Sequence, residues 1–535
     1  MLLNPKLFLA HSMKQNLSPL VDAMSRKEFY PHRPAEVEVR QTHISYVFLA
    51  GPYVYKIKKP VRFPFLDYST LQKRQHFCRE EVRLNRRLAP ETYLDVIGVC
   101  RSNTGFALTE NLPADDRVIE YAVKMKRLPE DRMLSLLVRQ EVAVPSLMLA
   151  IAKKLASFHE MASVENSRLY GSLDAIAANI RGNFEETRRF IDRTISLKLF
   201  ERIREYNETF FRENADLFAR RISEGRVREG HGDLRAEHIC LVDDIVIFDC
   251  VEFDEGLRYG DVASEIGFLS MDLDFLGAAD PAAELEVAYA SAARDPALAA
   301  LLPFYKCYRA YVRGKVESLK SEEREIADEG RRKASLQALR YFCLSSRYTK
   351  RENRPLLLVV CGMIATGKST LAWLLAALTG FEVIDSDRVR KKLAGIPATA
   401  RAGEEYQRGV YSAEFTQLTY EALLISAEKQ LASGKGVIVD ATFGDRKHRR
   451  LFLNRAGSLK IPVIFLECRA DENSIRRRLE ERAKSVREAS DGTWEIYQRM
   501  RRDFHPLSEI PQEHHLPIDT EHALLHDLDR IEELL

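Results

Sequence analysis

The segment LLLVVCGMIATGKST, residues 356–370, carries the most specific pattern in this chain of 535 residues. An apolar run at 356–360 leads into eight residues, from Gly362 to Ser369, that fit G-x-x-x-x-G-K-[ST]. The run predicts a buried strand and residues 371–378 predict a helix, which is the context this motif requires. A loop of this kind places backbone N–H groups around phosphates at a helix N-terminus, where the helix dipole favours negative charge.

Two side chains of this loop have expected roles in holding a nucleotide. Lys368 is expected to reach the β- and γ-phosphates of ATP, and Ser369 to offer its hydroxyl to Mg²⁺. The alternative is an ordinary glycine-rich turn between a strand and a helix, which the complete motif makes the weaker interpretation. The predicted nucleotide contacts of the loop are Gly362, Met363, Ile364, Ala365, Thr366, Gly367, Lys368, Ser369 and Thr370.

Length and composition limit the remaining possibilities. A chain of 535 residues with 45% hydrophobic residues predicts two to four packed domains. The 81 basic and 79 acidic residues give a net charge of only +2, which argues against a nucleic-acid partner without excluding one. The eight cysteines form no C-x-x-C or Cys/His cluster, so a reducing, cytoplasmic compartment is expected. The longest apolar run contains Lys368, and we expect no membrane association.

The first part of the chain has the order of elements found in a kinase-type small lobe. Strands are predicted at 37–40, 46–49, 53–58 and 118–125, and a helix rich in Arg and Glu at 71–88. Lys56 and Lys58 lie two residues apart on the third strand and therefore share a face, and Glu81 lies within the helix. In kinases a strand lysine holds the α- and β-phosphates and a helix glutamate holds the lysine. Taken alone, solvated lysines and an exposed helix face are the simpler interpretation, since no G-x-G-x-x-G precedes Lys56.

After residue 131 the pattern is mostly helical, with helices predicted at 146–161, 172–180, 184–193 and 197–222. The segment EGHGDLRAEHICLVDDIVIFDCVEFD, residues 229–254, interrupts these helices and strengthens the kinase-type interpretation. His231-Gly232-Asp233 is followed five residues later by His238, and a predicted hairpin at 239–248 leads to Asp249. Phosphoryl transfer needs an acid that accepts the proton of the acceptor hydroxyl and two groups that hold Mg²⁺. The kinase loop H-R-D-x-x-x-x-N and the metal-binding aspartate that follows it have this layout. Asp233 takes the position of the base, His238 that of the asparagine, and Asp249 that of the metal ligand.

Arg235 lies two residues after the predicted base, where a kinase loop carries a phosphate-contacting lysine. The alternative is that His231 and Asp233 stabilise a loop while Asp249 simply ends a strand. Two acids and two histidines at these spacings on a strand–turn–strand frame favour the site. They also favour Lys56 or Lys58, with Glu81, as nucleotide contacts.

Residues 30–350 resemble the aminoglycoside-phosphotransferase branch of the protein-kinase-like fold, through HGDLRAEH, IFDCVEFD and the strand VYKIKK. The resemblance implies ATP- and Mg²⁺-dependent transfer to a hydroxyl of a small molecule. The chain departs from the family in two respects. His238 replaces an asparagine, and imidazole is a poorer Mg²⁺ ligand than an amide oxygen. The loop expected to cover the phosphates also has no recognisable glycine pattern. A weakened or purely regulatory domain therefore stays open.

The last part of the chain alternates strands and helices, which predicts a parallel sheet with helices on both faces. Functional side chains then belong at the carboxyl ends of strands. Asp387, after the strand at 381–384, is expected to orient or deprotonate the acceptor hydroxyl, although it also fits an N-cap of a helix at 388–393. Arg390 is expected to hold an anionic group of the substrate. Asp440, after the strand at 436–439, is the predicted Mg²⁺ ligand, and Arg482 the predicted lid arginine.

This part resembles small P-loop kinases of the adenylate- and gluconate-kinase type, including predicted kinases near polynucleotide kinase and the zeta-toxin group. The resemblance rests on GMIATGKST, DSDRVR, VIVDATF and RRRLEER. Together the two parts resemble a bifunctional bacterial family. The predicted domains are a kinase-like domain at 1–350, with lobes at about 30–125 and 126–345, a linker at 345–355, and a P-loop domain at 356–535.

The sequence thus predicts an α+β protein-kinase-like two-lobed domain followed by an α/β P-loop NTPase domain with a parallel sheet. The predicted function is ATP-dependent transfer of the γ-phosphoryl group to a small-molecule hydroxyl at two sites. Two alternatives stay open at this point. One is a P-loop kinase regulated by a catalytically weak kinase-like domain, and the other is a nucleic-acid end kinase. The sequence does not predict the oligomeric state.

Overall fold

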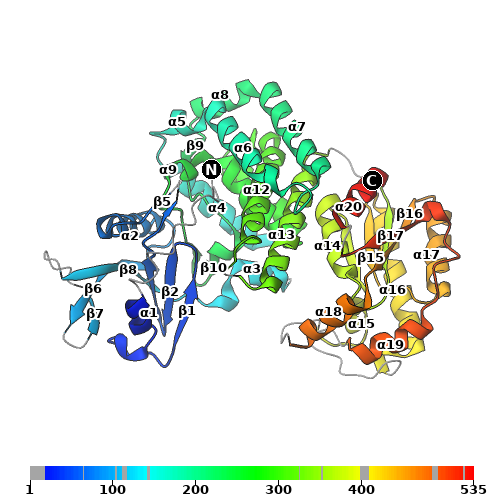
Figure 1. The fold of residues 1–535 in the computed structure, drawn as a ribbon. Coiled ribbons are helices and arrows are strands. Elements are labelled where there is room, and N and C mark those ends of the chain that lie inside the picture. The colour runs from blue at the N-terminus through cyan, green and yellow to red at the C-terminus, as the bar shows by residue number, and fades with distance from the viewer. Residues whose placement is uncertain are drawn as a thin grey trace. The chain divides into compact units, whose positions relative to one another are not determined.

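The computed structural model describes residues 18–63, 66–102, 105–110, 117–140, 145–324, 326–350, 354–397, 409–484, 492–521 and 524–535. The chain divides into two compact units (Figure 1). The first unit comprises Met1–Arg189 and Arg204–Leu319, and the second comprises Phe190–Ile203 and Lys320–Leu535.

The first unit begins with a six-stranded antiparallel sheet in the order β1-β2-β3-β8-β6-β7. Helix α2 (Leu71–Asn85) packs on β8 and β6, and Thr70 caps its N-terminus by accepting a hydrogen bond from the backbone of Lys73. The strands predicted at 37–40, 46–49, 53–58 and 118–125 are present, whereas β6 and β7 were not predicted. The strands are β1 (Val37–Gln41), β2 (Ser45–Ala50), β3 (Tyr53–Lys58), β6 (Tyr93–Ser102), β7 (Gly105–Thr109) and β8 (Val118–Lys126).

The rest of the first unit is mainly helical and carries two short β-pairs. Strand β10 (Ile239–Leu241) pairs antiparallel with β11 (Ile245–Ile247), as predicted, and β9 (Val227–Glu229) pairs with β12 (Tyr259–Asp261). The larger helices that contribute here are α4 (Pro145–Met161), α6 (Leu173–Thr187), α7 (Leu197–Glu213), α8 (Ala215–Ser223), α10 (Val262–Phe275), α11 (Ala279–Ala292) and α12 (Leu298–Lys320).

Two of the predicted helices in this region have different limits. The helix predicted at 184–193 does not form, because Phe184 belongs to α6 and the chain leaves that helix after Thr187. The single helix predicted at 197–222 is interrupted at Asn214, whose backbone is not helical. The Asn214 amide donates a hydrogen bond to the carbonyl of Phe210 at 3.0 Å, so it closes the end of α7.

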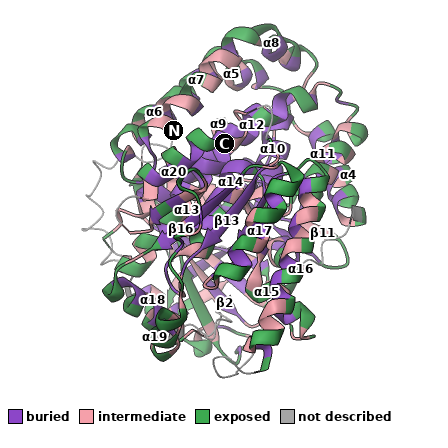
Figure 2. Cartoon of the chain, turned by 90° about the vertical axis from the view of Figure 1, so that its right-hand side faces the viewer, coloured by how far each residue is buried: buried purple, intermediate pink, exposed green. Residues whose placement is uncertain are grey.

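The second unit contains a five-stranded parallel sheet in the order β14-β15-β13-β16-β17. All five residues of the central strand β13 (Leu357–Cys361) are buried, and Figure 2 shows this strand within the purple interior. A run of consecutive apolar residues is what a strand covered on both faces requires. The other strands are β14 (Glu382–Asp385), β15 (Val437–Asp440), β16 (Val463–Arg469) and β17 (His515–Asp519), of which β17 was not predicted.

The helices of this sheet are α14 (Lys368–Thr379), α15 (Ser386–Leu393), α16 (Ala413–Ala432), α17 (Arg446–Leu459), α18 (Glu472–Lys484), α19 (Trp494–Asp503) and α20 (Leu524–Leu534). Helix α13 (Asp328–Arg347) packs against α14 and belongs to this unit. The packing units therefore divide the chain before the linker predicted at 345–355, part of which (351–353) lies outside the described residues. In the part of the chain that the structure describes, no helix has the length and apolarity needed to cross a membrane.

Candidate active sites

Two lysines and one glutamate connect strand β3 to helix α2. The Nζ atom of Lys56 lies 2.8 Å from Oε1 of Glu81, and the Nζ atom of Lys58 lies 2.7 Å from Oε2 of the same carboxylate. The side chain of Lys58 is fully buried, whereas 14% of the Lys56 side chain stays exposed. Lys56 is therefore the lysine that a ligand can reach.

Lys56 also contacts the residue that follows the β10–β11 hairpin. Its ammonium group donates a hydrogen bond to Oδ1 of Asp249 at 2.8 Å. Burial alone would lower the pKa of Lys56, but Asp249 and Glu81 outweigh it and raise the pKa above its usual value. Lys58 instead pairs with Glu252, three residues after Asp249, and Tyr68 donates to the same carboxylate at 2.5 Å. The predicted lysine and metal-ligand positions are thus brought together.

Asp249 has an unusual backbone conformation. Its φ of 64° lies in the left-handed region, which costs free energy for a residue other than glycine and occurs most often at functional sites. The surrounding groups fix it: the Asp249 N–H donates to the hydroxyl of Tyr93 at 3.1 Å, and the Cys250 N–H donates to Oδ1 of Asn85 at 2.8 Å. The Asp249 carboxylate is therefore held toward Lys56 by the backbone.

Asp233, the predicted base, forms a two-pronged ion pair with Arg235. Nε and Nη2 of the guanidinium each lie 3.1 Å from an oxygen of the carboxylate. Burial alone would raise the pKa of Asp233, but Arg235 and His238 hold it well below its usual range. The structure therefore places Arg235 on the base itself, where it keeps the carboxylate charged and orients it.

The carboxylate of Glu265, in α10, binds the backbone of the loop that carries Asp233. This carboxylate accepts hydrogen bonds from the backbone of His231, at 2.7 Å, and of Gly232, and its other oxygen lies 3.0 Å from Nε2 of His159. Burial alone would raise the pKa of Glu265, but hydrogen bonding to His159 lowers it to about 2. A Cβ atom on residue 230 would lie 2.5 Å from the carboxyl group of Glu265. Only glycine at this position therefore lets that carboxylate come so close to the backbone of the loop.

In the second unit, the loop after β13 has the backbone that a phosphate-binding loop needs. Gly362 has a φ of 134°, and a Cβ atom there would lie 2.7 Å from the carbonyl oxygen of Cys468. Gly367, with a φ of 95°, occupies the N-cap of α14. Lys368 folds back over the loop and donates to the carbonyl of Met363 at 2.8 Å. Its ammonium group therefore lies above the loop, where phosphates bind in proteins of this kind.

Acidic side chains line the adjacent strand ends. Asp440, at the end of β15, is buried and accepts a hydrogen bond from the hydroxyl of Ser369. Burial raises its pKa, while Lys368 opposes the rise. A hydroxyl and a carboxylate oxygen are suitable Mg²⁺ ligands, so Ser369 and Asp440 fit the ion that accompanies ATP. Asp387 is exposed in the first turn of α15 and free for the role predicted for it.

The N-cap of α15 is Asp385, not Asp387: Asp385 Oδ1 accepts from the Arg388 N–H at 2.8 Å. Asp385 is the register partner of Asp440 across β14 and β15. Burial, followed by the charge of Asp440, raises the pKa of Asp385 to about 6. Asp385 was not predicted as a site residue. Both strands nevertheless end in an apolar run followed by an aspartate, VID at 383–385 and VIVD at 437–440, and this shared ending indicates two acids side by side.

The predicted arginines lie in different surroundings. Arg390 is buried and donates to the carbonyl of Val410 at 2.7 Å, so it ties α15 to the start of α16. Arg482 lies on α18, near enough to Asp440 to lower the pKa of that carboxyl group. Arg478, one turn earlier, donates to the carbonyl of Ala365 at 3.1 Å and therefore supports the phosphate-binding loop. The roles predicted for Arg390 and Arg482 stay predictions.

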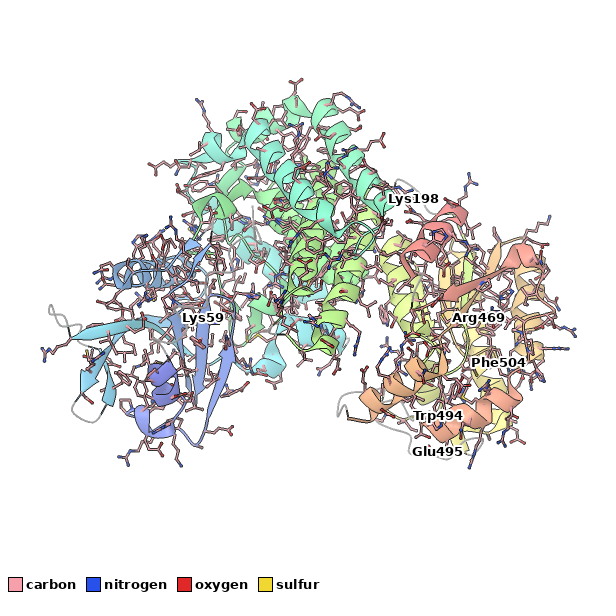
Figure 3. The ribbon with its side chains drawn as sticks, in the orientation of Figure 1. Lys59, Lys198, Arg469, Trp494, Glu495 and Phe504 are labelled. Carbon is pink, nitrogen blue, oxygen red and sulfur yellow. The ribbon has the colours of Figure 1, made fainter. Side chains whose placement is uncertain are left out.

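Helices α18 and α19 cover the apolar residues of this loop. Ala365 packs in a cluster with Ile475, Leu479 and Tyr497, and the rings of Trp494 and Tyr497 stack with centroids 5.0 Å apart. Figure 3 labels Trp494 and Glu495 at the start of α19. The residues between the fixed positions of the motif thus form a small core.

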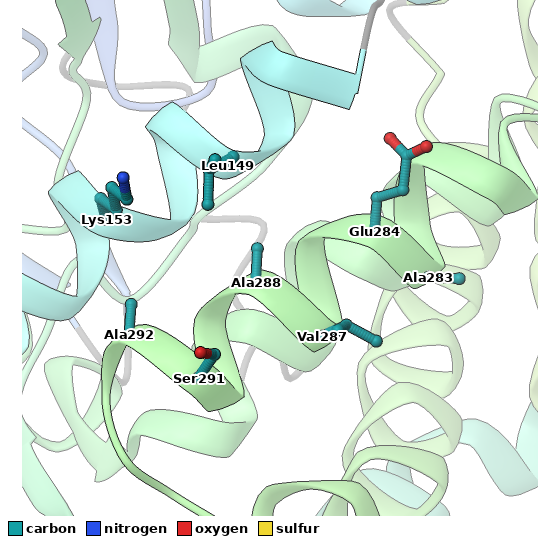
Figure 4. Close-up of a pocket in the computed structure, with 8 residues that line it drawn as sticks. All are labelled: Leu149, Lys153, Ala283, Glu284, Val287, Ala288, Ser291 and Ala292. Carbon is teal, nitrogen blue, oxygen red and sulfur yellow. The ribbon is translucent and has the colours of Figure 1, made fainter.

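A surface pocket of about 580 Å³ lies away from the residues above. It is formed by α4 and α11, with Leu149 and Lys153 on one side and Val287 and Ala288 on the other (Figure 4). None of the predicted site residues lines it.

Comparison with known proteins identifies the family of the chain and a domain within its second unit. A family model described as an AAA domain matches residues 357–507. The uncharacterized protein Rv2004c of Mycobacterium tuberculosis (strain ATCC 25618 / H37Rv) is 33% identical over 462 residues, which are 86% of this chain and 88% of that protein. The chain belongs to the Rv2004c family.

Two solved structures illustrate what the first unit is similar to. One is a choline/ethanolamine kinase family protein from Mesorhizobium loti, 13% identical, with a TM-score of 0.39 over 67% of this chain and 99% of that chain. The other is the GDP complex of aminoglycoside 2'-phosphotransferase-IIIa, 14% identical, with a TM-score of 0.37 over 60% of this chain and 97% of that chain.

The predicted fold class, an α+β kinase-like domain followed by an α/β P-loop domain, is confirmed. The antiparallel six-stranded sheet, the parallel five-stranded sheet and the match of an AAA-domain model to residues 357–507 agree with it. This member of the Rv2004c family thus combines a domain of kinase-like fold with a P-loop domain.

Proposed function

We propose that both units transfer the γ-phosphoryl group of ATP to a hydroxyl group of a small molecule, each with a divalent metal ion such as Mg²⁺. The observation that carries the proposal for the first unit is the connected set Glu81–Lys56–Asp249, with Asp233 on the neighbouring loop. A lysine and a metal-ligand carboxylate in contact are what phosphate positioning requires. None of the eight cysteines, all of which lie within the described residues, forms a disulfide, which fits a cytoplasmic enzyme.

The chain's own residues account for the steps at the first site. Lys56 would hold the α- and β-phosphates, and Asp249 would hold the divalent ion, which would supply positive charge against the phosphate oxygens. The acceptor oxygen forms a bond to the γ-phosphorus as the bond from that phosphorus to the β-phosphate oxygen breaks. Asp233 accepts the proton of the acceptor hydroxyl, and ADP leaves. Arg235 keeps Asp233 ionised until then.

The second site achieves the same transfer with different groups. Lys368 and the backbone N–H groups of the loop hold the phosphates, while Ser369 and Asp440 fit the metal ion. The acceptor would lie beside Asp387 and Asp385, at the ends of the strands. Arg390 would hold an anionic group of the acceptor, and Arg482 of α18 would neutralise the charge that develops on the transferred phosphoryl group.

The test uses the full-length protein with ATP, Mg²⁺ and a metabolite extract, and measures which metabolites gain the mass of one phosphoryl group. Asp233→Asn and Lys368→Ala disable the two sites separately, and Lys435→Ala, an exposed lysine, is the matched control. We expect each disabled site to remove a different product. Retention of every product by the Asp233→Asn variant would instead support a regulatory first unit. A product confined to nucleic-acid ends, with activity that falls with salt, would replace the small-molecule proposal.

A further inference from the structure

The structure fixes the tautomer of His238, the residue that occupies the asparagine position of the first site. Nδ1 of His238 lies 2.8 Å from the carbonyl oxygen of Asp233. A carbonyl oxygen only accepts hydrogen bonds, so Nδ1 carries the hydrogen. In the neutral imidazole Nε2 is then left with an exposed lone pair, the form in which histidine binds metals. A carbonyl behind the other ring nitrogen is also the usual support of a metal-binding histidine.

Nε2 of His238 lies near the Asp249 oxygen that does not accept the hydrogen bond from Lys56. Nε2 lies 3.7 Å from Oδ2 of Asp249, while Oδ1 accepts the hydrogen bond from Lys56. Two ligands about 2.1 Å from one ion are about 3.0 Å apart at an angle of 90° and about 3.6 Å apart at 120°. The observed separation therefore accommodates one ion after a small rotation of either side chain.

The orientation of His238 is held by its neighbours. Only 8% of the residue is exposed, and its ring lies between those of His231 and Phe248, with centroid distances of 6.1 and 5.9 Å. Glu237 is the other acid nearby, 3.9 Å from Nε2, but its carboxylate pairs with Arg235. No group of three or more metal-binding side chains occurs in the described part of the chain, so phosphate oxygens and water would fill the other coordination positions.

We propose that His238 Nε2 and Asp249 Oδ2 bind the metal ion of the first site, and that the nitrogen ligand makes this site select Mn²⁺ over Mg²⁺. The inference rests on the proposed function for the nucleotide that shares the ion. Mg²⁺ strongly prefers oxygen ligands in a rigid octahedron, whereas imidazole suits first-row transition metals, and Mn²⁺ is the one among these that also suits carboxylate and water oxygens. The second site, with oxygen ligands from Ser369 and Asp440, would keep the ordinary Mg²⁺ preference.

The direct test is pulsed electron paramagnetic resonance of Mn²⁺ bound with the β,γ-methylene analogue of ATP. The full-length Lys368→Ala variant is used so that only the first site holds the nucleotide. We expect the nitrogen modulation of a coordinated imidazole, which changes when the protein is labelled with ¹⁵N-histidine. That labelling separates the imidazole from the nitrogens of the nucleotide.

His238→Asn supplies the ligand that the resemblance leads us to expect at this position. In the Lys368→Ala background it should bind the metal–nucleotide complex, lose the nitrogen modulation and lower the Mn²⁺/Mg²⁺ affinity ratio at least tenfold. His76→Asn, an exposed histidine of α2, is the matched control and should change neither reading. Thermal unfolding of each variant shows whether it is folded.

Two results overturn the inference. Metal–nucleotide binding without histidine nitrogen modulation, or with the same modulation in His238→Asn, defeats the ligand assignment and leaves the proposed function intact. Failure of the first site to bind the nucleotide with either metal defeats both the inference and the proposed function of the first unit.

Discussion

The two sites contain the same kinds of groups, a lysine and acids, but hold them in different ways. In the first site the charges neutralise one another: Lys56 contacts both Glu81 and Asp249. In the second, Lys368 donates to a backbone carbonyl, and the strand-end acids Asp440 and Asp385 have raised pKa values. The first site is prepared by side-chain ion pairs, and the second by backbone geometry around groups that a metal ion and phosphates would neutralise.

This difference predicts which substitutions each site tolerates. A side-chain network fails when one member is lost, because its partners are left as buried, unpaired charges. A backbone cradle survives the loss of a side chain as a structure but loses the charge that acts on the phosphates.

The largest expected effects separate the two sites. Lys368→Ala should lower the transfer rate at the second site by about 10²–10³-fold, since one preorganised charge on the phosphates is lost. Asp233→Asn should lower the rate at the first site by about 10²–10⁴-fold through loss of the base. Rates with each site's own product are the measurement. Loss of both products in either variant would contradict the independence of the sites.

The next effect tests the anchoring of the first site. Glu265→Gln keeps the shape but removes the charge that accepts hydrogen bonds from the backbone of His231 and Gly232. We expect kcat at the first site to fall about 10–100-fold with a smaller change in KM, because a misplaced base costs rate more than binding. Glu224→Gln, an exposed acid after α8, is the control. An unchanged kcat would show that the loop does not need this anchor.

A smaller effect concerns pH at the second site. Because the folded pKa of Asp385 is raised to about 6, the folded protein binds more protons than the unfolded chain between pH 4 and 6. Stability contributed by this group is therefore full below the unfolded pKa near 3.8 and is lost as the pH rises through about 6. Asp385→Asn keeps an N-cap residue and removes the charge, so it should raise Tm at pH 7 but not at pH 4.

The exposed Glu414→Gln, in the first turn of α16, is the control for that comparison, and its Tm should stay the same at both pH values. Equal Tm shifts for Asp385→Asn at pH 4 and pH 7 would show that charge is not the cause.

The smallest expected effect lies in the support of the phosphate-binding loop. Arg478→Lys cannot keep both the contact with the carbonyl of Ala365 and those with Thr520. We expect nucleotide affinity at the second site to fall about threefold to tenfold, measured by calorimetric titration. Arg477→Lys, which faces Ser474 and Glu521, is the control and should not change the affinity.

The sequence was informative where a function depends on local spacing. The segment 362–369 and the spacing of Asp233, His238 and Asp249 depend on a single loop or hairpin, so their grouping was predictable. Glu265 and Glu252 were not predicted, because their roles come from contacts between distant segments that no local pattern records. The N-cap of α15 was predicted at Asp387 and is Asp385, because a sequence pattern locates a helix end only to within one or two residues.

The helix limits and strands that were not predicted correctly also depend on contacts that a local pattern does not record. Asn214 interrupts a run with continuous apolar periodicity because its side chain closes the preceding helix, a choice that periodicity does not reveal. The strands β6 and β7 extend the first sheet through pairing partners that are distant along the chain or joined by a weak turn signal.

The packing of α13 on α14 has a practical consequence for expressing the second unit. The guanidinium of Arg340 lies over the ring of Trp373, 5.2 Å from its centroid, and the side chain of Arg347 lies close to Gly380. A shortened polypeptide that starts at the first residue of the P-loop strand would leave this face of α14 bare. Such a fragment is expected to self-associate, whereas one that starts at residue 320 keeps this face of α14 covered by α13.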